Sequence, residues 1–560
     1  MKATELIGRT WSLIAESGGW LSIAEMAMTV LGALLPVGLL WTIGRLVDAT
    51  IATVGAGDGI GGVAPWALTF GVVLLLTTLQ GIAERVVSMR LRGRIEMRVN
   101  EMTHSKSQSL SHIQKTDPAF QTTMYRAMRG SGERVAATYF TMVEFLQGIL
   151  TFGAMSGWLA RATWWMPLAV IAAGLPVMAV RVSAARSRHE LEKSLTESER
   201  RKDYLSRVLT NIDYSQELQM FGIGGRFARE HAEQDRATER KRQRHVGEEA
   251  TKQAIAATVS AVLMVMVFLM VIYEVASGGL TIGLLATLLL AIRRADTAMT
   301  GIAMRTSTLQ SEWLRLEEFY KFMDTEPASS GDEKFPKDFA TIELRDVTFR
   351  YPGSGRTALS HMNMTIRRGE TVAIVGPNGS GKSTIAQIIG GLLTPTEGHA
   401  SIGGVEIASI SRDDMSQHVT ALFQDFRLFC TTATENIAFG RSGEEIDEEE
   451  IHRAARATGI DSLLRALPQG YATTLGNRFA GSEMFSRGEW QRLALTRVMY
   501  SRAEIVILDE PSSALDTAAR EELRHVMDEM RGEGRTIVMI THSEDMAAMA
   551  DREIRISARD

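Results

Sequence analysis

Two short segments in the second half of the chain carry residues suited to binding and cleaving a chain of phosphates. The first, Gly376–Ser383, fits the pattern G-x-x-x-x-G-K-[ST] completely and follows the apolar run Thr371–Val375. Glycines let backbone N–H groups curl around phosphate oxygens, and the helical stretch that begins at Thr384 adds the partial positive charge of its N-terminus. We therefore expect Lys382 to reach the β- and γ-phosphates of a nucleotide, and Ser383 to hold Mg²⁺. The expected nucleotide contacts in this segment are Gly376, Pro377, Asn378, Gly379, Ser380, Gly381, Lys382, Ser383 and Thr384.

The second segment, Ile505–Glu510, is an apolar run that ends in two acids. We expect Asp509 to bind Mg²⁺, directly or through water, and Glu510 to polarise an attacking water molecule as a general base. An ordinary acidic strand end is the simpler interpretation, but the phosphate-binding segment elsewhere in the chain argues against it. Together the two segments predict hydrolysis of a nucleoside triphosphate.

Short strands that alternate with helices are expected to position both segments. Thr341–Phe349 alternates apolar and polar residues, and the apolar runs Thr371–Val375 and Ile505–Leu508 are typical of buried strands. This order predicts an α/β domain over residues 341–560, with the nucleotide at the strand ends. The preceding stretch, Glu326–Ala340, is rich in Pro, Ser, Gly and charge, which predicts a linker.

The first half of the chain holds long apolar runs that the second half lacks. In a bilayer, backbone polar groups must be satisfied within their own segment, so runs of about 20 apolar residues predict membrane-spanning helices. We expect six such helices, of which the last is interrupted by Arg293, Arg294 and Asp296. The predicted spans are Gly18–Gly44, Pro65–Ala83, Val135–Leu159, Thr163–Val180, Ala254–Ala276 and Thr281–Thr300.

The connections between the predicted spans alternate in charge. Residues 49–64 and 277–280 contain no Lys or Arg, and the turn after the third span has only Arg161. Residues 85–134 and 181–252 are long, rich in Lys and Arg, and helical in character. The positive-inside rule therefore places these long segments and both termini in the cytosol, and predicts a multi-pass protein of the plasma (inner) membrane.

Composition excludes some classes of protein. The net charge of -5 gives no basic field for nucleic acid, and the single cysteine, Cys430, excludes an intramolecular disulfide framework. The first apolar run contains acids, Glu16 and Glu25, and has no basic segment leading into a short apolar core. We therefore expect a retained membrane helix instead of a cleaved signal peptide.

These motifs resemble the ATP-binding cassette (ABC) transporter family. Six apolar helices followed by one cassette are similar to the exporter-type half transporters of the peptide, multidrug and lantibiotic group, and the resemblance covers the whole chain. It implies a multidomain fold: a six-helix α-helical transmembrane domain (residues 1–325), a linker (326–340) and an α/β P-loop NTPase cassette (341–560). It also implies transport driven by ATP, with Mg²⁺, in a lipid bilayer.

The resemblance assigns further roles to single residues. Tyr351 matches the aromatic residue that stacks on adenine, and Gln424 matches the glutamine that senses Mg²⁺ and touches the membrane domain. His542, which follows the apolar run Thr536–Ile540, matches the switch histidine that contacts the γ-phosphate. Ser513–Asp516 matches the segment that crosses the dimer interface. The expected catalytic residues are thus Glu510, His542 and Gln424, and the expected Mg²⁺ ligands are Ser383, Gln424 and Asp509.

The signature segment of the family is present in altered form. Its pattern is Leu-Ser-Gly-Gly followed by Gln or Glu, and here Phe485–Glu489 reads Phe-Ser-Arg-Gly-Glu. In the family this segment closes on ATP held by the other cassette, so Ser486, Gly488 and Glu489 are expected ATP contacts. Arg487 replaces a glycine that lets backbone approach phosphate. Its side chain would either block closure or add a cation near the phosphate.

The altered signature also bears on the partner. In heterodimeric members of the family, the subunit with an intact Glu and His often donates an altered signature to its partner's weakened site. This chain combines Lys382, Glu510 and His542 with Arg487. We therefore favour a different half transporter as the partner over a second copy of this chain. A homodimer with a tolerated substitution remains the alternative.

Two loop tips are implied to couple the domains, Thr116–Phe120 and Asp213–Phe221. Charged residues within the predicted spans, including Glu144 and Arg293, indicate either a polar cavity for an anionic or zwitterionic cargo or, more simply, ion pairs between helices. We expect an ATP-driven exporter of a peptide-like or amphipathic secondary metabolite. A flippase for lipids or lipid-linked glycans, an importer with the exporter fold, and a sensor ATPase that signals to a partner are the alternatives.

Overall fold

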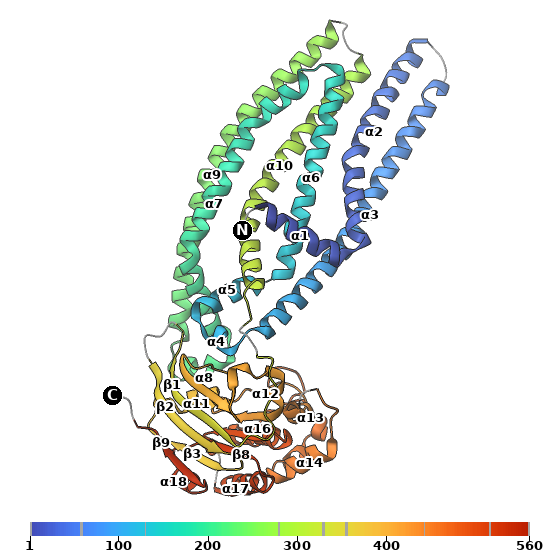
Figure 1. Ribbon diagram of the computed structural model, residues 1–560. Helices are drawn as coiled ribbons and strands as arrows, with labels where there is room; N and C mark the ends of the chain where they lie inside the picture. Colours follow the sequence, from blue (N-terminus) through green and yellow to red (C-terminus); the bar gives the residue numbers. More distant parts are fainter. Residues whose placement is uncertain are drawn as a thin grey trace. The chain divides into compact units, whose positions relative to one another are not determined.

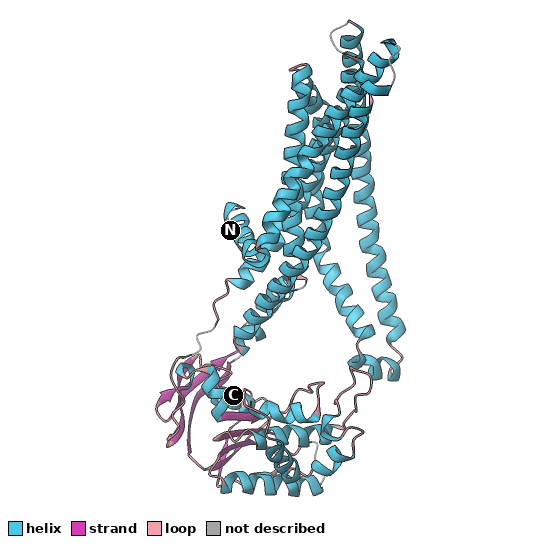
Figure 2. Ribbon diagram, turned by 90° about the vertical axis from the view of Figure 1, so that its right-hand side faces the viewer, coloured by secondary structure: helices cyan, strands magenta, loops and turns pink. Residues whose placement is uncertain are grey.

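The residues of the chain fall into two compact units (Figure 1). The helical unit comprises residues 1–107 and 123–325, and the α/β unit comprises residues 108–122 and 326–560. Figure 2 shows that the strands of the described residues all lie in the α/β unit. The computed structural model describes residues 3–56, 60–128, 130–277, 281–327, 331–352, 357–441, 443–513 and 517–557.

Six long helices dominate the helical unit, and each contains one predicted span apart from up to three residues at its start. The helices also run far beyond the apolar parts, as the helical character of the long basic segments predicted. In Figure 1, α7 and α9 lie side by side along their length. The six helices are α2 (Trp20–Ala56), α3 (Ala64–Ser109), α6 (Ser131–Ala162), α7 (Met166–Thr210), α9 (Gly224–Ala276) and α10 (Ile282–Met323).

Five helices in the described part of the chain are long and apolar enough to cross a membrane, namely α2, α3, α6, α7 and α9. The sixth predicted span lies in α10, which has 42 residues but carries Arg293, Arg294 and Asp296 in the middle of its apolar part. This span therefore stays a prediction. Its inner face nevertheless packs into the bundle, because Ala291, Ile292 and Ala295 are fully buried.

A separate helix, α1 (Ala3–Gly18), precedes the first predicted span. The helix is interrupted at Gly19, whose φ of +51° lies in the left-handed region that glycine adopts without a Cβ penalty. The apolar side chains of α1 are buried against the bundle. At its polar face, Arg9 donates two hydrogen bonds to the carboxylate of Asp324, which follows α10, over 2.7 and 2.6 Å. The first and last helices of this unit are therefore tied together.

Ion pairs join the polar halves of α7 and α9. Both helices continue past their long apolar stretches as charged segments, in which a few apolar residues such as Leu195 and Leu205 are buried. Opposite charges also face each other across the two helices, and each such ion pair contributes modestly to stability. The pairs are Arg188–Glu249 at 2.9 Å, Arg201–Glu230 at 2.5 Å, Lys202–Asp235 at 2.7 Å and Arg242–Glu199 at 3.0 Å.

The two predicted coupling segments differ in their surroundings. Asp213–Phe221 coincides with α8 (Ser215–Met220) and its flanks, where Met220 and Phe221 are 85% and 70% exposed. Thr116–Phe120 lies where α4 (His112–Thr116) meets α5 (Pro118–Met128), and residues 108–122 cluster with the α/β unit.

Contacts inside the α/β unit explain that clustering. Ile113 of α4 packs against its buried apolar core, and Gln114 Nε2 donates a hydrogen bond to the carbonyl oxygen of Glu326 over 2.9 Å. A capping box formed by Ser111 and Gln114 starts α4.

Two sheets build the α/β unit; the three strands predicted from the sequence are confirmed, and the apolar run Thr536–Ile540 is also a strand. The antiparallel sheet has the order β2-β1-β4-β5, and the parallel sheet has the order β6-β7-β8-β3-β9. In the parallel sheet the carboxyl ends of neighbouring strands meet at one edge, where ligands bind in such folds. The strands are β1 (Thr341–Arg350), β2 (Thr357–Arg367), β3 (Thr371–Val375), β4 (Glu397–Ile402), β5 (Val405–Glu406), β6 (Val419–Leu422), β7 (Ile505–Asp509), β8 (Thr536–Ile540) and β9 (Arg552–Arg555).

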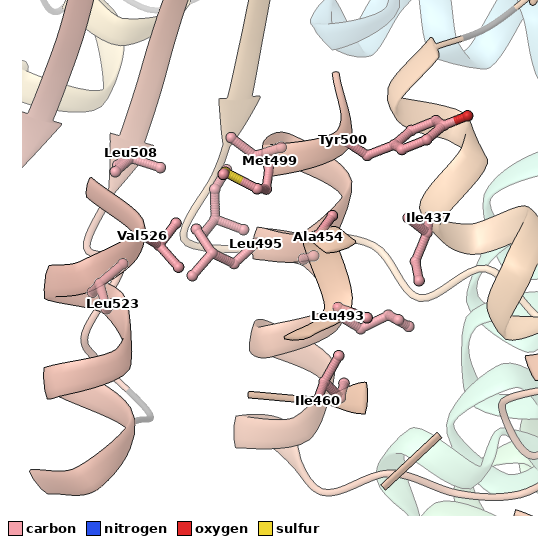
Figure 3. Packing of buried hydrophobic residues seen from close by; sticks show 14 of the residues in the cluster. Ile437, Ala454, Ile460, Leu493, Leu495, Met499, Tyr500, Leu508, Leu523 and Val526 are labelled. Carbon is pink, nitrogen blue, oxygen red and sulfur yellow. The ribbon is translucent and has the colours of Figure 1, made fainter. Parts of the chain in front are cut away.

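One apolar core seats α16 (Arg487–Tyr500) and α17 (Thr517–Gly532) on the parallel sheet. Figure 3 shows Leu495 of α16 and Val526 of α17 lying together beside Leu508 of β7. All three side chains are at most 3% exposed. Burial of this kind contributes about 1.5–3 kcal/mol for each large aliphatic side chain. The start of α16, which carries the altered signature, is thereby fixed on the sheet.

Part of the predicted linker belongs to the α/β core. Phe335 and Phe339 are only 3% and 2% exposed, and their rings meet edge to face at 5.9 Å. Phe335 also stacks on His418 at 4.5 Å, and its N–H donates to the Asp414 carboxylate over 2.5 Å. The polar composition of this stretch predicted a linker, but the two aromatic residues four positions apart indicated that part of it is buried.

Candidate nucleotide-binding site

The loop between β3 and α11 (Lys382–Ile389) is shaped by glycines. Gly379 and Gly381 have φ values of +80° and +95°, which other residues rarely adopt. At Gly376, an added Cβ would lie 2.5 Å from the carbonyl oxygen of Ile556. The helix cap at Gly381 makes no side-chain hydrogen bond, so the first N–H groups of α11 remain available for an anion.

Lys382, the first residue of α11, is folded over this loop. It is 7% exposed, and its Nζ donates hydrogen bonds to the carbonyl oxygens of Gly376 and Pro377 over 2.7 and 2.9 Å. Burial lowers the pKa of Lys382, while the negative charges of Glu510 and Asp509 act in the opposite direction. The ammonium group therefore lies between two carbonyls and two acids, where phosphate oxygens would compete for it.

The three predicted catalytic side chains touch one another. Glu510 accepts a hydrogen bond from Gln424 Nε2 on Oε2 at 2.7 Å, and His542 Nε2 lies 3.2 Å from its Oε1. Gln424 follows β6, Glu510 follows β7 and His542 follows β8, so three neighbouring strands supply them. Glu510 itself has a φ of +51°, and its N–H donates to the carbonyl oxygen of Ile540 over 2.9 Å. Such a conformation costs on the order of 1 kcal/mol and clusters at functional sites.

Asp509 ends β7 and is 4% exposed. Burial raises the pKa of Asp509, a hydrogen bond with Ser383 acts against that rise, and the charge of Glu510 adds to it. Ser383 and Asp509 thus offer a hydroxyl and a carboxylate oxygen side by side, which suits Mg²⁺ held partly by substrate phosphates. Among the described residues, no group of three or more His, Cys, Asp or Glu side chains is placed to hold a metal, and Mg²⁺ bound in this way does not need one.

A pocket of about 670 Å³ joins the phosphate loop to the acids. Tyr351 stands at its rim, with its hydroxyl 3.4 Å from Thr384 Oγ1 and from Gln387 Oε1, and its ring edge to face with Phe349. The volume falls within the range of small-molecule sites. The predicted site residues that line it are Tyr351, Asn378, Gly379, Gly381, Lys382, Ser383, Thr384, Gln424, Asp509, Glu510 and His542.

Other predicted contacts lie in the loop without lining the pocket. Gly376 and Pro377 supply the carbonyls that hold Lys382, and Ser380 is 4% exposed. The predicted interface segment is described only at Ser513, because Ala514–Asp516 lie outside the described residues.

Sequence reasoning missed three lining residues, Thr357, Ala358 and Ile540. Thr357 and Ala358 start β2, which pairs with β1 so that Thr357 lies opposite Arg350, next to Tyr351. Their only sequence signal was the pairing of two neighbouring strands.

The altered signature lies apart from this pocket in the same chain. Ser486 caps α16: its Oγ accepts from the N–H of Glu489 over 3.4 Å, and its own N–H donates to Glu489 Oε2 over 2.6 Å. Arg487 occupies the first position of the helix with an exposed side chain. The predicted contacts Ser486, Gly488 and Glu489 therefore stand at a second helix N-terminus, separate from the phosphate loop.

Charged residues of the helical unit are partly paired. Glu144 of α6 accepts a hydrogen bond from Arg305 Nε of α10 over 2.9 Å, which is the simpler arrangement that the sequence suggested. Arg293 and Arg294 are exposed, and Asp296 is half-buried. If the predicted sixth span crosses a membrane, charged groups in it would be costly in contact with lipid and would favour a wet cavity or a partner subunit.

Comparison with known proteins agrees with this geometry. Residues 359–513 match the sequence family described as ABC transporter. The chain is 26% identical over 502 residues to the nisin transport ATP-binding protein NisT of Lactococcus lactis subsp. lactis, covering 87% of this chain and 81% of that protein. It is 30% identical over 310 residues to the ATP-dependent lipid A-core flippase of Bordetella avium (strain 197N), covering 55% of this chain and about half, 51%, of that one.

The fold has a close counterpart among solved structures. A bacterial Atm1-family ABC exporter with ATP bound superposes with a TM-score of 0.78 at 22% identity, covering 96% of this chain and 94% of the other.

Proposed function

Because this chain belongs to the ABC transporter family and has the exporter fold, we propose that it is one half of an exporter that moves a peptide-like or amphipathic secondary metabolite out of the cytosol. The chain is an ATPase coupled to transport. The relative that matches over 87% of this chain, across both units, is named for nisin transport, and this observation carries the choice of cargo. The match to a lipid A-core flippase over 55% of the chain makes a lipid or lipid-linked glycan the second candidate.

In the proposed mechanism, the pocket binds ATP and Glu510 takes a proton from the attacking water. Gln424 and His542 hold the two carboxylate oxygens of Glu510 and so orient them. Lys382 and the open N-terminus of α11 bind the phosphates. Ser383 and Asp509 would hold Mg²⁺, with Gln424 beside them, and the metal would neutralise phosphate charge when bound. Tyr351 would stack on adenine.

The proposed partner is a second, different half transporter. One chain presents a phosphate loop and a signature at separate places, so a complete site requires a signature from another subunit. The exposed apolar residues of the α8 tip, Met220 and Phe221, are suited to a partner's cassette. We favour the heterodimer because Arg487 occupies the position at which a glycine would allow close approach to phosphate.

We further propose that the cassette and both termini are cytosolic, in the plasma membrane, with six spans including the apolar part of α10. ATP would act by binding the closed pair of cassettes more tightly than the open pair, since only differential affinity shifts an equilibrium.

Reconstitution tests these proposals. The full chain is purified into lipid nanodiscs and proteoliposomes, with and without the half transporter encoded by a neighbouring gene. We expect slow hydrolysis by the chain without its partner, faster hydrolysis with it, and stimulation by an amphipathic peptide such as nisin as probe. Robust hydrolysis by the homodimer would overturn the heterodimer. Peptide-independent hydrolysis together with translocation of a labelled lipid would replace the peptide cargo with the flippase. Hydrolysis with no translocation of either would favour the sensor.

A further inference from the structure

Glu25 occupies a core position of α2. The buried residues on this face recur at every fourth position, and Leu21, Glu25, Thr29 and Ala33 are 2%, 2%, 0% and 0% exposed. Glu25 is therefore about as buried as the uncharged residues one turn before and after it, Leu21 and Thr29. A charged carboxylate in such surroundings costs several kcal/mol unless it is paired.

No cation offsets that cost. Within the described residues, no Lys, Arg or His forms an ion pair with Glu25. The ionisable group that faces it from α3 is another acid, Glu84, which accepts a hydrogen bond from a neighbouring amide over 2.8 Å, and from α6 it is the phenol of Tyr139. Arg92, about two turns further along α3, stacks on the ring of Phe140 at 4.9 Å. The electrostatic surroundings thus disfavour a negative charge on Glu25.

The hydrogen bonds of Ser88 also favour a neutral Glu25. Ser88 Oγ lies 2.8 Å from Glu25 Oε1 and 2.7 Å from the carbonyl oxygen of Glu84. A hydroxyl has one proton, and both neighbours are acceptors if Glu25 is a carboxylate. A protonated Glu25 resolves this conflict, because its own O–H donates to Ser88 Oγ while Ser88 donates to Glu84.

The remaining polar atoms agree with a neutral acid. Glu25 Oε2 and the Tyr139 hydroxyl are both buried, and neither has a hydrogen-bond partner among the described residues. An unsatisfied oxygen costs less on a neutral carboxyl than on a charged one.

We propose that the helical unit binds a proton at Glu25, and that this proton stabilises the packing of α2 against α3 and α6. When the helices separate and water reaches the carboxyl group, its proton passes to water and no other bond changes. Over the pH range in which the packed carboxyl is protonated and the water-exposed carboxyl is ionised, each unit rise in pH should weaken this packed arrangement about tenfold, as linkage to one proton requires. This inference is independent of the cargo and of the partner.

Infrared spectroscopy tests it directly. The full chain in lipid nanodiscs is titrated with acid and base, and the carbonyl stretch of protonated carboxylic acids is followed in difference spectra. We expect the difference spectrum between the wild type and Glu25→Gln, a neutral isostere that keeps the packing, to contain a protonated-acid band that persists at neutral pH. In Ser88→Ala the band should shift in frequency, since its hydrogen-bond partner is removed.

Glu84→Gln is the matched control, because this neighbouring acid is partly exposed and accepts a hydrogen bond already; the band should remain. A second measurement follows thermal unfolding against pH. The wild type should lose stability as pH rises, and Glu25→Gln should lose this pH dependence. No protonated-acid band in this difference spectrum at any pH at which the wild type is folded, or identical pH profiles for the two proteins, would each overturn the proposal.

Discussion

Two helices of the α/β unit begin where a phosphate is expected to bind, and they begin differently. At α11, Gly381 leaves the first N–H groups without a side-chain cap, and Lys382 lies over them. At α16, Ser486 accepts a hydrogen bond from the N–H of Glu489 and donates its own N–H to the Glu489 carboxylate, while Arg487 projects into solvent.

The difference teaches how each end can act. The backbone N–H groups at the start of α11 can bind an anion without losing a side-chain cap, and only Lys382 exchanges its carbonyl partners for phosphate oxygens, so this end suits a resident site for ATP. At the capped end, phosphate must compete with the capping box, whose loss costs about 1 kcal/mol. This end therefore suits a contact that forms only when two cassettes close.

The largest effect should come from Glu510→Gln, which keeps the shape of the nucleotide pocket and removes the proposed general base. We expect ATP hydrolysis to fall by at least about 100-fold, the lower range for loss of a general base, with ATP still bound. Phosphate release and equilibrium binding of a fluorescent ATP analogue measure the two. Glu521→Gln, an exposed acid on α17, should change neither. Undiminished hydrolysis would remove Glu510 from its proposed role.

A second test, Lys382→Ala, should weaken phosphate binding at the N-terminus of α11. Loss of charge-assisted hydrogen bonds should raise the Kd for ATP about 10- to 100-fold. Binding of the fluorescent analogue measures it, and the exposed Lys337→Ala serves as control. Equal binding by both variants would show that the N-terminus of α11 holds phosphate without the ammonium group.

Replacing Arg487 with Gly makes the capped end resemble the family pattern. Relief of about 1 kcal/mol of steric conflict on closure should raise hydrolysis by the chain without a partner about three- to tenfold. Arg487→Lys, which keeps the charge, should not. If Arg487→Gly instead lowers hydrolysis, Arg487 acts as a cation on the phosphate and a homodimer becomes the better proposal.

The smallest effect concerns stability and pH. Burial raises the pKa of Asp509, so its folded-state pKa lies above the unfolded value. Its contribution to stability is complete below the unfolded pKa and is lost as pH rises through the folded pKa. Without nucleotide or Mg²⁺, Asp509→Asn should therefore raise Tm at neutral pH, by roughly 2–4 °C per kcal/mol, and the gain should vanish below about pH 4.

Calorimetry of the full chain in EDTA checks this. The exposed Asp528→Asn on α17 should leave Tm unchanged at both pH values. A lower Tm for Asp509→Asn at neutral pH would show that the carboxylate stabilises the empty site.

Much of the fold followed from the sequence because its signals were local. Apolar runs gave the long helices, and Thr371–Val375 and Thr536–Ile540 are strands with those bounds. The separate helix α1 was missed, since only the conformation of Gly19 divides it from the first span. The burial of Phe335 was missed because its partners come from distant segments.

The site was predictable where a motif fixed the backbone, as around Lys382, and where strand order brought residues together, as for Glu510 and His542. Contacts between side chains that are distant in the sequence could not be predicted from it. Nothing in the sequence placed Gln424 on one oxygen of Glu510, or revealed that Glu489 caps its own helix.

The contact between Arg9 and Asp324 has a consequence for biosynthesis. These residues are 315 positions apart. At about 5–20 residues per second, a ribosome needs roughly 15 to 60 s to make the intervening chain. Throughout that time the apolar face of α1 lacks its final neighbours on α10, so lipid or a chaperone must cover it. Helix α1 is synthesised before α10 but reaches its final packing only after α10 has been made.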